Sequence, residues 1–465
     1  MFRMVLTVLL ALCLYSPVLA QDDIPLEAFT RNPQIAIPVI SPDGRRIAML
    51  SDLGGRQAVM VISRDGDAPA GADVSQVRPE RLFWASNNIV IIVASIPDET
   101  SYGILDHQAM FALDLNRPDR LRELFSRDRL DSDLRFNANR ANVVGRAPDS
   151  NALIVSMRTG FESRALFSLN PETGLYIPVD RTSEPVFDYA VDNQGRPLAR
   201  ASYHHRSERY VLELKGEEFW SEVIERQEPI LTQSMWGLLY GSEDELVMSE
   251  RPLIGGRRLV TVSSSTGEFV RTLYENPDFD FTTVVRDNYD NSIVGVDIDE
   301  DMPSTVWFDP QLAQIQTTLD AAIPDAYVTM LSWSEDRSQV TLAAARYNRP
   351  NEYFLFDGTA MQLAGLGSAY PELATATLPE RQAIRYRASD GTIIPAYLTT
   401  PTGEGPFPMV VLPHGGPANR DVGGFDDMAH FLASRGYLVF QPNFRGSGGY
   451  GFAWESAGWG AGEQA

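Results

Sequence analysis

A histidine and a pair of glycines follow a short apolar run near the C-terminal end of the sequence. The run is Met409-Val410-Val411-Leu412, and the turn after it is His414-Gly415-Gly416-Pro417. The run predicts a strand, and a strand that stops at two glycines leaves backbone N–H groups uncovered. Such donors can face a carbonyl oxygen that becomes negative during acyl transfer. The turn therefore indicates half of a hydrolase site.

The nucleophile that this chemistry needs does not stand in the sequence. No Gly-x-Ser-x-Gly pattern occurs in the 465 residues, although that pattern marks a serine on a sharp strand-to-helix turn. Ser447 is no substitute, because it has no glycine two residues before it. Cys13 is the only cysteine, so neither a cysteine nucleophile nor a thiolate metal site is expected in the mature chain. We expect the chain to be catalytically inert as written.

The elements around the turn predict a parallel sheet. Residues 383–387 and 393–398 are apolar runs on either side of Ser389-Asp390-Gly391, which is a hairpin pattern. Residues 426–434 have helical spacing, and residues 437–440 form a continuous apolar run typical of a strand buried on both faces. Strand, helix and strand in this order form a βαβ unit, which predicts a parallel sheet. We expect the strand at 437–440 to have an unpaired edge.

The longer part of the sequence, from about residue 35 to 370, has the pattern of short strands separated by polar turns. Turn patterns return at intervals of about 45 residues, the length of a four-stranded propeller blade. This spacing predicts an all-β propeller of about seven blades, and the alternative is a pair of β-sandwiches. A longer gap predicts an insertion near residues 127–135. The turns begin at Ser41, Trp84, Ala147, Asp192, Gly241, Asp287 and Ser334.

The N-terminal residues have the pattern of a secretory signal peptide. Arg3 supplies a positive start, residues 5–15 are apolar, and Val18-Leu19-Ala20 offers a cleavage site before Gln21. The alternative is an uncleaved anchor, but the apolar run is shorter than the roughly 20 residues of a membrane span. We expect a periplasmic or secreted protein with no membrane attachment after cleavage. The expected domains are a signal peptide (1–20), a propeller (21–372) and the beginning of an α/β domain (373–465).

Charge and composition exclude several kinds of partner and cofactor. The net charge of −23 excludes nucleic acid, because phosphate binding needs a basic face. Asp297, Asp299 and Asp301 resemble half of a calcium loop, but Met302 stands where that loop needs glycine. We therefore expect no metal. An oligomer is compatible with the sequence, which indicates no particular interface.

The stretch from Gly446 to Gly451 matches a dinucleotide-binding fingerprint, but its surroundings do not fit a cofactor site. The helix that should follow it is short, and the acidic residue expected about 20 residues later would lie beyond the end of this sequence. We therefore expect no cofactor, and a loop that packs against the strand ending in the histidine–glycine turn. Arg445 is interpreted either as an ion-pair partner that fixes this loop or as a substrate-binding residue.

Three motifs together resemble the prolyl oligopeptidase family of serine peptidases, in particular its acylaminoacyl-peptidase and dipeptidyl-peptidase-like members. They are the turn at 414–417, the helix end at 433–437 and the loop at 443–451, followed by Trp459-Gly460. The resemblance implies a seven-bladed propeller over an α/β-hydrolase domain, with a triad in the chain order Ser, Asp, His. It also implies that all three triad residues lie beyond this sequence, which would then be an N-terminal fragment.

The resemblance assigns roles to individual residues. The backbone N–H of Gly416 would be one oxyanion donor, and His414 would hold the turn rather than act as the base. The implied function is cleavage of short peptides by an exported enzyme, because a propeller screens the site from folded proteins. The alternatives are a non-catalytic periplasmic propeller that binds a ligand, a pseudoenzyme, and an α/β-hydrolase esterase.

Overall fold

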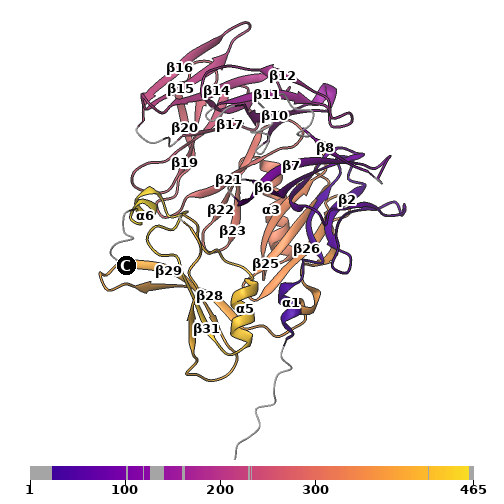
Figure 1. Ribbon diagram of the computed structural model, residues 1–465, viewed down its shortest axis with the longest axis vertical. Helices are drawn as coiled ribbons and strands as arrows, with labels where there is room; N and C mark the ends of the chain where they lie inside the picture. The colour runs from indigo at the N-terminus through magenta and orange to yellow at the C-terminus, as the bar shows by residue number, and fades with distance from the viewer. Residues whose placement is uncertain are drawn as a thin grey trace, which may run out of the picture.

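The computed structural model (Figure 1) describes residues 24–100, 103–118, 120–125, 141–159, 163–228, 231, 233–416 and 418–459. The expected signal peptide and the expected insertion near residues 127–135 lie outside the described residues. Among the described residues, no helix is long and apolar enough to cross a membrane.

The described residues form seven successive antiparallel sheets, each built from strands that are consecutive in the chain. We call these sheets blades 1 to 7. Blades 1 to 3 contain β1 (Ile35–Ile40), β2 (Arg46–Asp52), β3 (Gln57–Ser63), β4 (Ala70–Asp73), β5 (Arg78–Ser86), β6 (Ile89–Thr100), β7 (Gly103–Asp114), β8 (Leu121–Leu124), β9 (Asn142–Ala147), β10 (Ala152–Arg158), β11 (Arg164–Leu169) and β12 (Tyr176–Asp180). A short 3-10 helix, Pro148–Ser150, joins β9 to β10.

Blades 4 to 7 continue the same pattern, with one exception in blade 6. Their strands are β13 (Val186–Val191), β14 (Pro197–His204), β15 (Arg209–Lys215), β16 (Trp220–Gln227), β17 (Ser234–Leu238), β18 (Glu245–Glu250), β19 (Arg258–Ser263), β20 (Phe269–Tyr274), β21 (Phe281–Arg286), β22 (Ile293–Asp299), β23 (Pro303–Trp307), β24 (Tyr327–Trp333), β25 (Gln339–Arg346), β26 (Arg349–Asp357) and β27 (Gln362–Ser368). Blade 6 has three strands instead of four and is followed by helix α3 (Pro310–Ala322).

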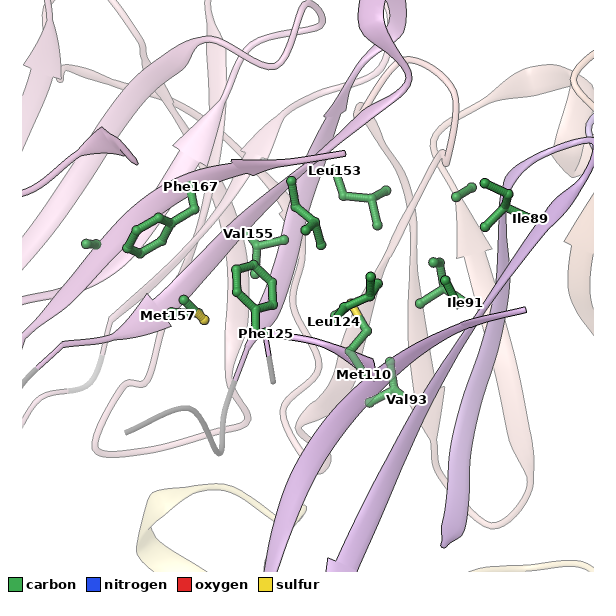
Figure 2. Close-up of a cluster of buried hydrophobic side chains, with 14 residues drawn as sticks. Ile89, Ile91, Val93, Met110, Leu124, Phe125, Leu153, Val155, Met157 and Phe167 are labelled. Carbon is green, nitrogen blue, oxygen red and sulfur yellow. The ribbon is translucent and has the colours of Figure 1, made fainter. Parts of the chain in front are cut away.

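Apolar clusters join the blades to one another. Figure 2 shows the cluster between blades 2 and 3, where Ile91 and Met110 face Leu153 and Val155. Comparable clusters of buried side chains lie between the other neighbouring pairs of blades. Full burial of such a side chain stabilises the fold by about 1.5–3 kcal/mol. Core burial therefore holds the blades together.

The first and last blades meet, so the sheets close into a ring. Ile40 and Ile47 of blade 1 pack with Leu355 of blade 7. The Thr341 hydroxyl donates to the carbonyl oxygen of Pro38 at 2.8 Å, and the Ile40 N–H donates to Ser332 Oγ at 3.3 Å. The seven-bladed propeller is confirmed, and the alternative of two sandwiches is wrong.

An eighth sheet follows the ring. It contains β28 (Glu380–Arg387), β29 (Ile393–Thr400), β30 (Met409–Val411) and β31 (Leu438–Pro442), in the spatial order β28-β29-β31-β30. The β28–β29 hairpin is antiparallel, and β30 pairs with β31 in parallel. Helix α5 (Asp427–Ser434) connects these two parallel strands, and the Asp426 carboxylate caps it by accepting the Ala429 N–H. The predicted strand–helix–strand unit is confirmed.

One expectation for this sheet is wrong. The strand at 437–440 was expected to have an unpaired edge, but β31 is paired on both sides, with β29 and with β30. The edge strand is β30, whose Met409 and Val411 are exposed. Val439 of β31 is buried, whereas Leu438 and Phe440 are partly exposed.

Three short helices link the ring to the eighth sheet. They are α1 (Leu26–Thr30), α4 (Pro371–Ala374) and α6 (Phe452–Ser456). Helix α1 lies beside α5 in Figure 1, and Phe29 meets Phe431 with ring centroids 5.6 Å apart. On the side of blade 5, Arg251 forms an ion pair with Glu455 of α6. The eighth sheet is therefore held against the propeller at two places.

Candidate functional site

The histidine–glycine turn leaves the sheet directly after β30. The last ladder contact of this strand is the Leu412 N–H donating to the Phe440 carbonyl at 2.9 Å. Gly415 and Gly416 are exposed, and no acceptor within the described residues takes the N–H of Gly416. The donor that the sequence predicts for an oxyanion is therefore uncovered. Its catalytic role stays a prediction.

The His414 side chain folds back over its own turn. Its Nδ1 lies 2.7 Å from the Gly415 carbonyl oxygen, and its Nε2 lies 2.7 Å from Ser447 Oγ. The ring stacks on Phe444 with centroids 4.6 Å apart and an interplanar angle of 9°. These contacts hold the imidazole against its own turn, and the role of His414 in supporting an oxyanion turn stays a prediction.

The glycine-rich loop between β31 and α6 packs on the turn segment. The Gly448 N–H donates to the Asn419 carbonyl at 3.0 Å. Asn443 accepts the Asp421 N–H at 2.8 Å and donates to the Asp421 carbonyl at 2.9 Å. A Cβ at Gly448 would lie 2.5 Å from the Ala418 carbonyl oxygen, so this close approach needs glycine. The loop thus packs against residues 418–421, which follow the turn, while packing against the strand β30 stays a prediction.

Arg445 projects from this loop to the β28–β29 hairpin. Its guanidinium pairs with the Asp390 carboxylate and lies 3.4 Å from Thr392 Oγ1. The hydrogen bond from Arg445 lowers the pKa of Asp390 to about 2. The arginine therefore fixes the loop against the hairpin, and its role in substrate binding stays a prediction.

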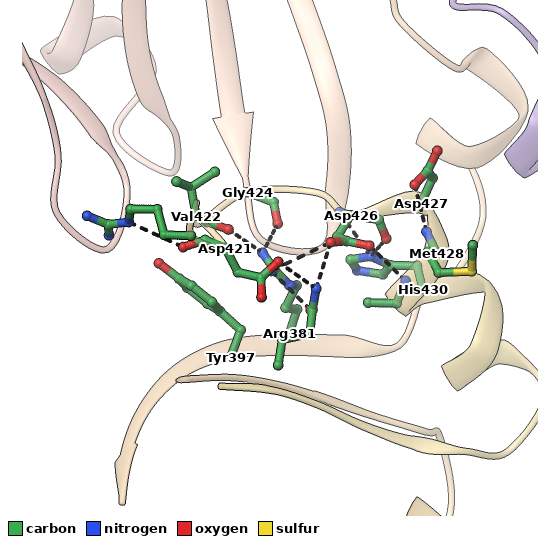
Figure 3. Close-up of polar contacts among 12 residues, drawn as sticks. Arg381, Tyr397, Asp421, Val422, Gly424, Asp426, Asp427, Met428 and His430 are labelled. Carbon is green, nitrogen blue, oxygen red and sulfur yellow. Dashed lines mark hydrogen bonds and ion pairs between the residues drawn. The ribbon is translucent and has the colours of Figure 1, made fainter. Parts of the chain in front are cut away.

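A buried arginine, which the sequence reasoning missed, holds the segment between the turn and α5. Arg381 of β28 donates to the carbonyls of Val422 and Gly424 at 3.0 and 2.7 Å, and to Gln441 Oε1 at 3.2 Å (Figure 3). Its guanidinium also lies over the Tyr397 ring at 4.4 Å. The sequence offers no signal for this, because a single arginine on a hairpin strand normally faces solvent.

Helix α5 carries a second buried group, His430, which Figure 3 shows beside Asp426. The ring is fully buried, its Nδ1 lies 2.7 Å from the Asp426 carbonyl oxygen, and it stacks on Phe425. Because that oxygen only accepts, Nδ1 donates the hydrogen bond. Burial lowers the pKa of His430 to about 4.

His430 should make the folded protein sensitive to acid. Between pH 6.5 and 4 the unfolded chain binds a proton at His430 while the folded chain does not, so the free energy of unfolding falls as pH falls. The loss should reach about 3 kcal/mol below pH 4. Urea unfolding of His430→Gln at several pH values should show a shallower dependence than the parent. His205→Gln removes an exposed ring instead, and the free energy of unfolding of this control should depend on pH as in the parent. The same pH dependence in all three proteins would contradict the effect expected of His430.

The centre of the propeller contains a cavity of about 1210 Å³. The first strand of each blade contributes to its wall, and the wall carries charged groups of both signs. Burial raises the pKa of Asp188 to about 6 and lowers the pKa of Arg286 to about 10. The ring therefore encloses a polar space at its axis.

The chain resembles known peptidases over most of its length. Residues 424–465 match the family model described as the prolyl oligopeptidase family. A dipeptidyl aminopeptidase BIII from Pseudoxanthomonas mexicana is 24% identical over 461 residues, which cover 93% of this chain and 62% of the relative. Dipeptidyl peptidase family member 6 from Caenorhabditis elegans is 32% identical over 158 residues, or 29% of this chain and 21% of the relative. The chain thus spans less than two thirds of either relative.

Solved structures show the same fold. A puromycin-hydrolyzing peptidase from Mycobacterium tuberculosis has a TM-score of 0.58 at 17% identity, covering 93% of this chain and 70% of that protein. Prolyl oligopeptidase B from Galerina marginata has a TM-score of 0.61 at 13% identity, covering 93% and 65%. The family match over residues 424–465, together with a propeller followed by the start of a hydrolase sheet, makes the chain similar to peptidases of the prolyl oligopeptidase family.

Proposed function

We propose that the protein is a serine peptidase that cleaves short peptides by acyl transfer, with the Gly416 N–H as one of its oxyanion donors. The observation that carries this proposal is the uncovered glycine turn at the end of β30, next to the strand–helix–strand unit. A backbone N–H held in this way can stabilise the negative oxygen of a tetrahedral intermediate. The peptidase relatives give the same reaction class.

The preference for short peptides is supported by the propeller. The ring lies on one side of the eighth sheet and contacts the loop at 443–451 through the Asp280 N–H, which donates to the Gly449 carbonyl at 2.9 Å. Arg420, which follows the glycine turn, donates in turn to the Glu300 carbonyl of blade 6 at 2.7 Å. A folded protein would be kept away from a site beneath such a cap, whereas a short peptide would reach it.

We include export in the proposal because of the residues at the N-terminus. The basic start, the apolar run and the small residues before Gln21 together have the pattern of a cleaved signal. N-terminal sequencing of the protein recovered from the periplasm or the medium should begin at Gln21. An intact Met1 there would contradict cleavage.

Labelling of the natural protein at its full length tests the reaction class. A fluorophosphonate should modify one serine, and aminoacyl-p-nitroanilides should be hydrolysed faster than p-nitrophenyl esters of comparable acyl groups. Faster ester hydrolysis would favour the esterase alternative. No labelled serine and no hydrolysis would favour a propeller that binds without catalysis.

A further inference from the structure

The Gly416 N–H shares a peptide unit with the Gly415 carbonyl. The peptide is trans, since the only cis bond among the described residues precedes Pro406. In a planar trans peptide, the C=O and N–H bonds point in opposite directions. Whatever fixes the direction of the Gly415 carbonyl therefore also fixes the direction of the proposed oxyanion donor.

The turn itself offers little steric restraint on this peptide. A Cβ placed on Gly415 would meet no described atom within 4 Å, and one on Gly416 would come no closer than 3.8 Å, to the Ala418 nitrogen. Glycine also has more conformational freedom than any other residue. The orientation of the peptide must therefore come from a hydrogen bond rather than from packing.

The imidazole of His414 supplies that bond. The Gly415 carbonyl oxygen can only accept, so the Nδ1 atom at 2.7 Å carries the proton and donates it. In the neutral ring the Nε2 atom is then an acceptor. The Ser447 hydroxyl, 2.7 Å from Nε2, must donate to it. The serine thereby holds the ring whose Nδ1–H donates to the Gly415 carbonyl.

Ser447 is well placed for this task. The residue is fully buried, and its own N–H donates to the Phe444 carbonyl at 3.0 Å. Phe444 also stacks on the imidazole at 4.6 Å. The hydroxyl and the aromatic ring thus hold the imidazole from the same loop, one at its edge and one at its face.

We propose that Ser447 is a positioning residue, which acts through His414 to aim the Gly416 N–H at the reacting carbonyl. This inference rests on the proposed peptidase function. Ser447 would touch neither the substrate nor the nucleophile. Its hydroxyl holds the imidazole of His414 in place, the imidazole fixes the Gly415 carbonyl, and the shared peptide fixes the donor.

The kinetic test uses the natural protein at its full length. Ser447→Ala should lower kcat about 10–100-fold, as loss of a supporting hydrogen bond commonly does, with KM nearly unchanged because the donor acts in the transition state. Ser447→Cys, which keeps a weak donor, should recover part of the loss. Ser434→Ala removes a hydroxyl that bonds to the Phe431 carbonyl of α5, and it should leave kcat at the parent value.

A second measurement does not depend on activity. Nitrogen NMR of histidine-labelled protein should show His414, identified by the loss of its signal in His414→Gln, as the Nδ1–H tautomer. Ser447→Ala should shift the Nε2 resonance, because this acceptor atom loses its hydrogen-bond donor. If Ser447→Ala does not fold, Phe444→Leu can replace it, because this variant removes the ring that stacks on the imidazole. It should likewise lower kcat and change the nitrogen signals of His414.

The two measurements separate the possible failures. An Nε2–H tautomer in the parent, or an unchanged kcat in Ser447→Ala, would overturn the positioning role. A parent protein that hydrolyses no peptide would overturn the proposed function instead. The NMR measurement of the His414 tautomer would then be the remaining test of whether the imidazole holds the Gly415 carbonyl.

Discussion

Replacing Gly416 by proline in the natural protein should lower peptide turnover about 10²–10³-fold, the usual effect of losing one oxyanion donor. Proline has no N–H, so the substitution deletes the proposed donor and adds no charge. The loss should fall on kcat, with KM close to that of the parent, because the oxygen is negative only in the transition state. Steady-state kinetics on a dipeptidyl or aminoacyl p-nitroanilide would measure it.

Gly416→Ala is the matched control for this experiment. It keeps the N–H, its Cβ would lie 3.8 Å from the Ala418 nitrogen, and Gly416 does not have the left-handed φ that disfavours other residues. Turnover should therefore stay within a few-fold of the parent, and thermal unfolding should show whether either variant changes the fold. Equal turnover in the proline variant and the parent would remove Gly416 from the mechanism.

The propeller could be predicted because its turns have local causes. Each of the seven turn patterns lies between the first and second strands of a blade, as Ser41-Pro42-Asp43-Gly44 does between β1 and β2. Gly44 has a φ of +70°, and a Cβ there would lie 2.8 Å from Gln339 Cγ of blade 7. Turns of this kind depend on the types of a few adjacent residues, so they can be predicted from a single sequence.

The helix that follows the three-stranded blade 6 also has a local signal in the sequence. Asp309 accepts the N–H groups of Gln311 and Leu312, and Pro310 occupies the first position of α3. Aspartate followed by proline is a common helix start. The sequence therefore carries a local signal for this helix, although the spacing of the turns predicts only strands there.

The order of the last sheet depends on contacts that are distant in sequence. Because the helix crossover brings β31 back between β29 and β30, the exposed edge belongs to the earlier strand. The placement of side chains across this sheet is equally non-local. His414 meets Ser447 and Arg381 meets Gly424 only after the strands have paired, so neither contact has a signature in the neighbouring residues.

The largest expected effect on stability comes from Arg381. Its side chain is 1% exposed, so removing it would leave the carbonyl of the buried Gly424, and that of Val422, without their donor. The Asp426 carboxylate, 3.9 Å from the guanidinium, would also lose its nearest described cation. Loss of one partner from a buried charged network typically costs about 3–5 kcal/mol.

Arg381→Met, which keeps an apolar stem of similar length, should therefore lower the free energy of unfolding by about 3–5 kcal/mol in urea denaturation. Arg387→Met on the same strand removes an exposed guanidinium that bonds to the Gly391 carbonyl, and it should change stability by no more than about 0.5 kcal/mol. Since Arg381 holds residues 422–424 between the glycine turn and α5, its loss should also loosen that turn. Equal stability of the two variants would mean that water replaces the guanidinium, and that the segment is held by the contacts of Asn443 with Asp421 instead.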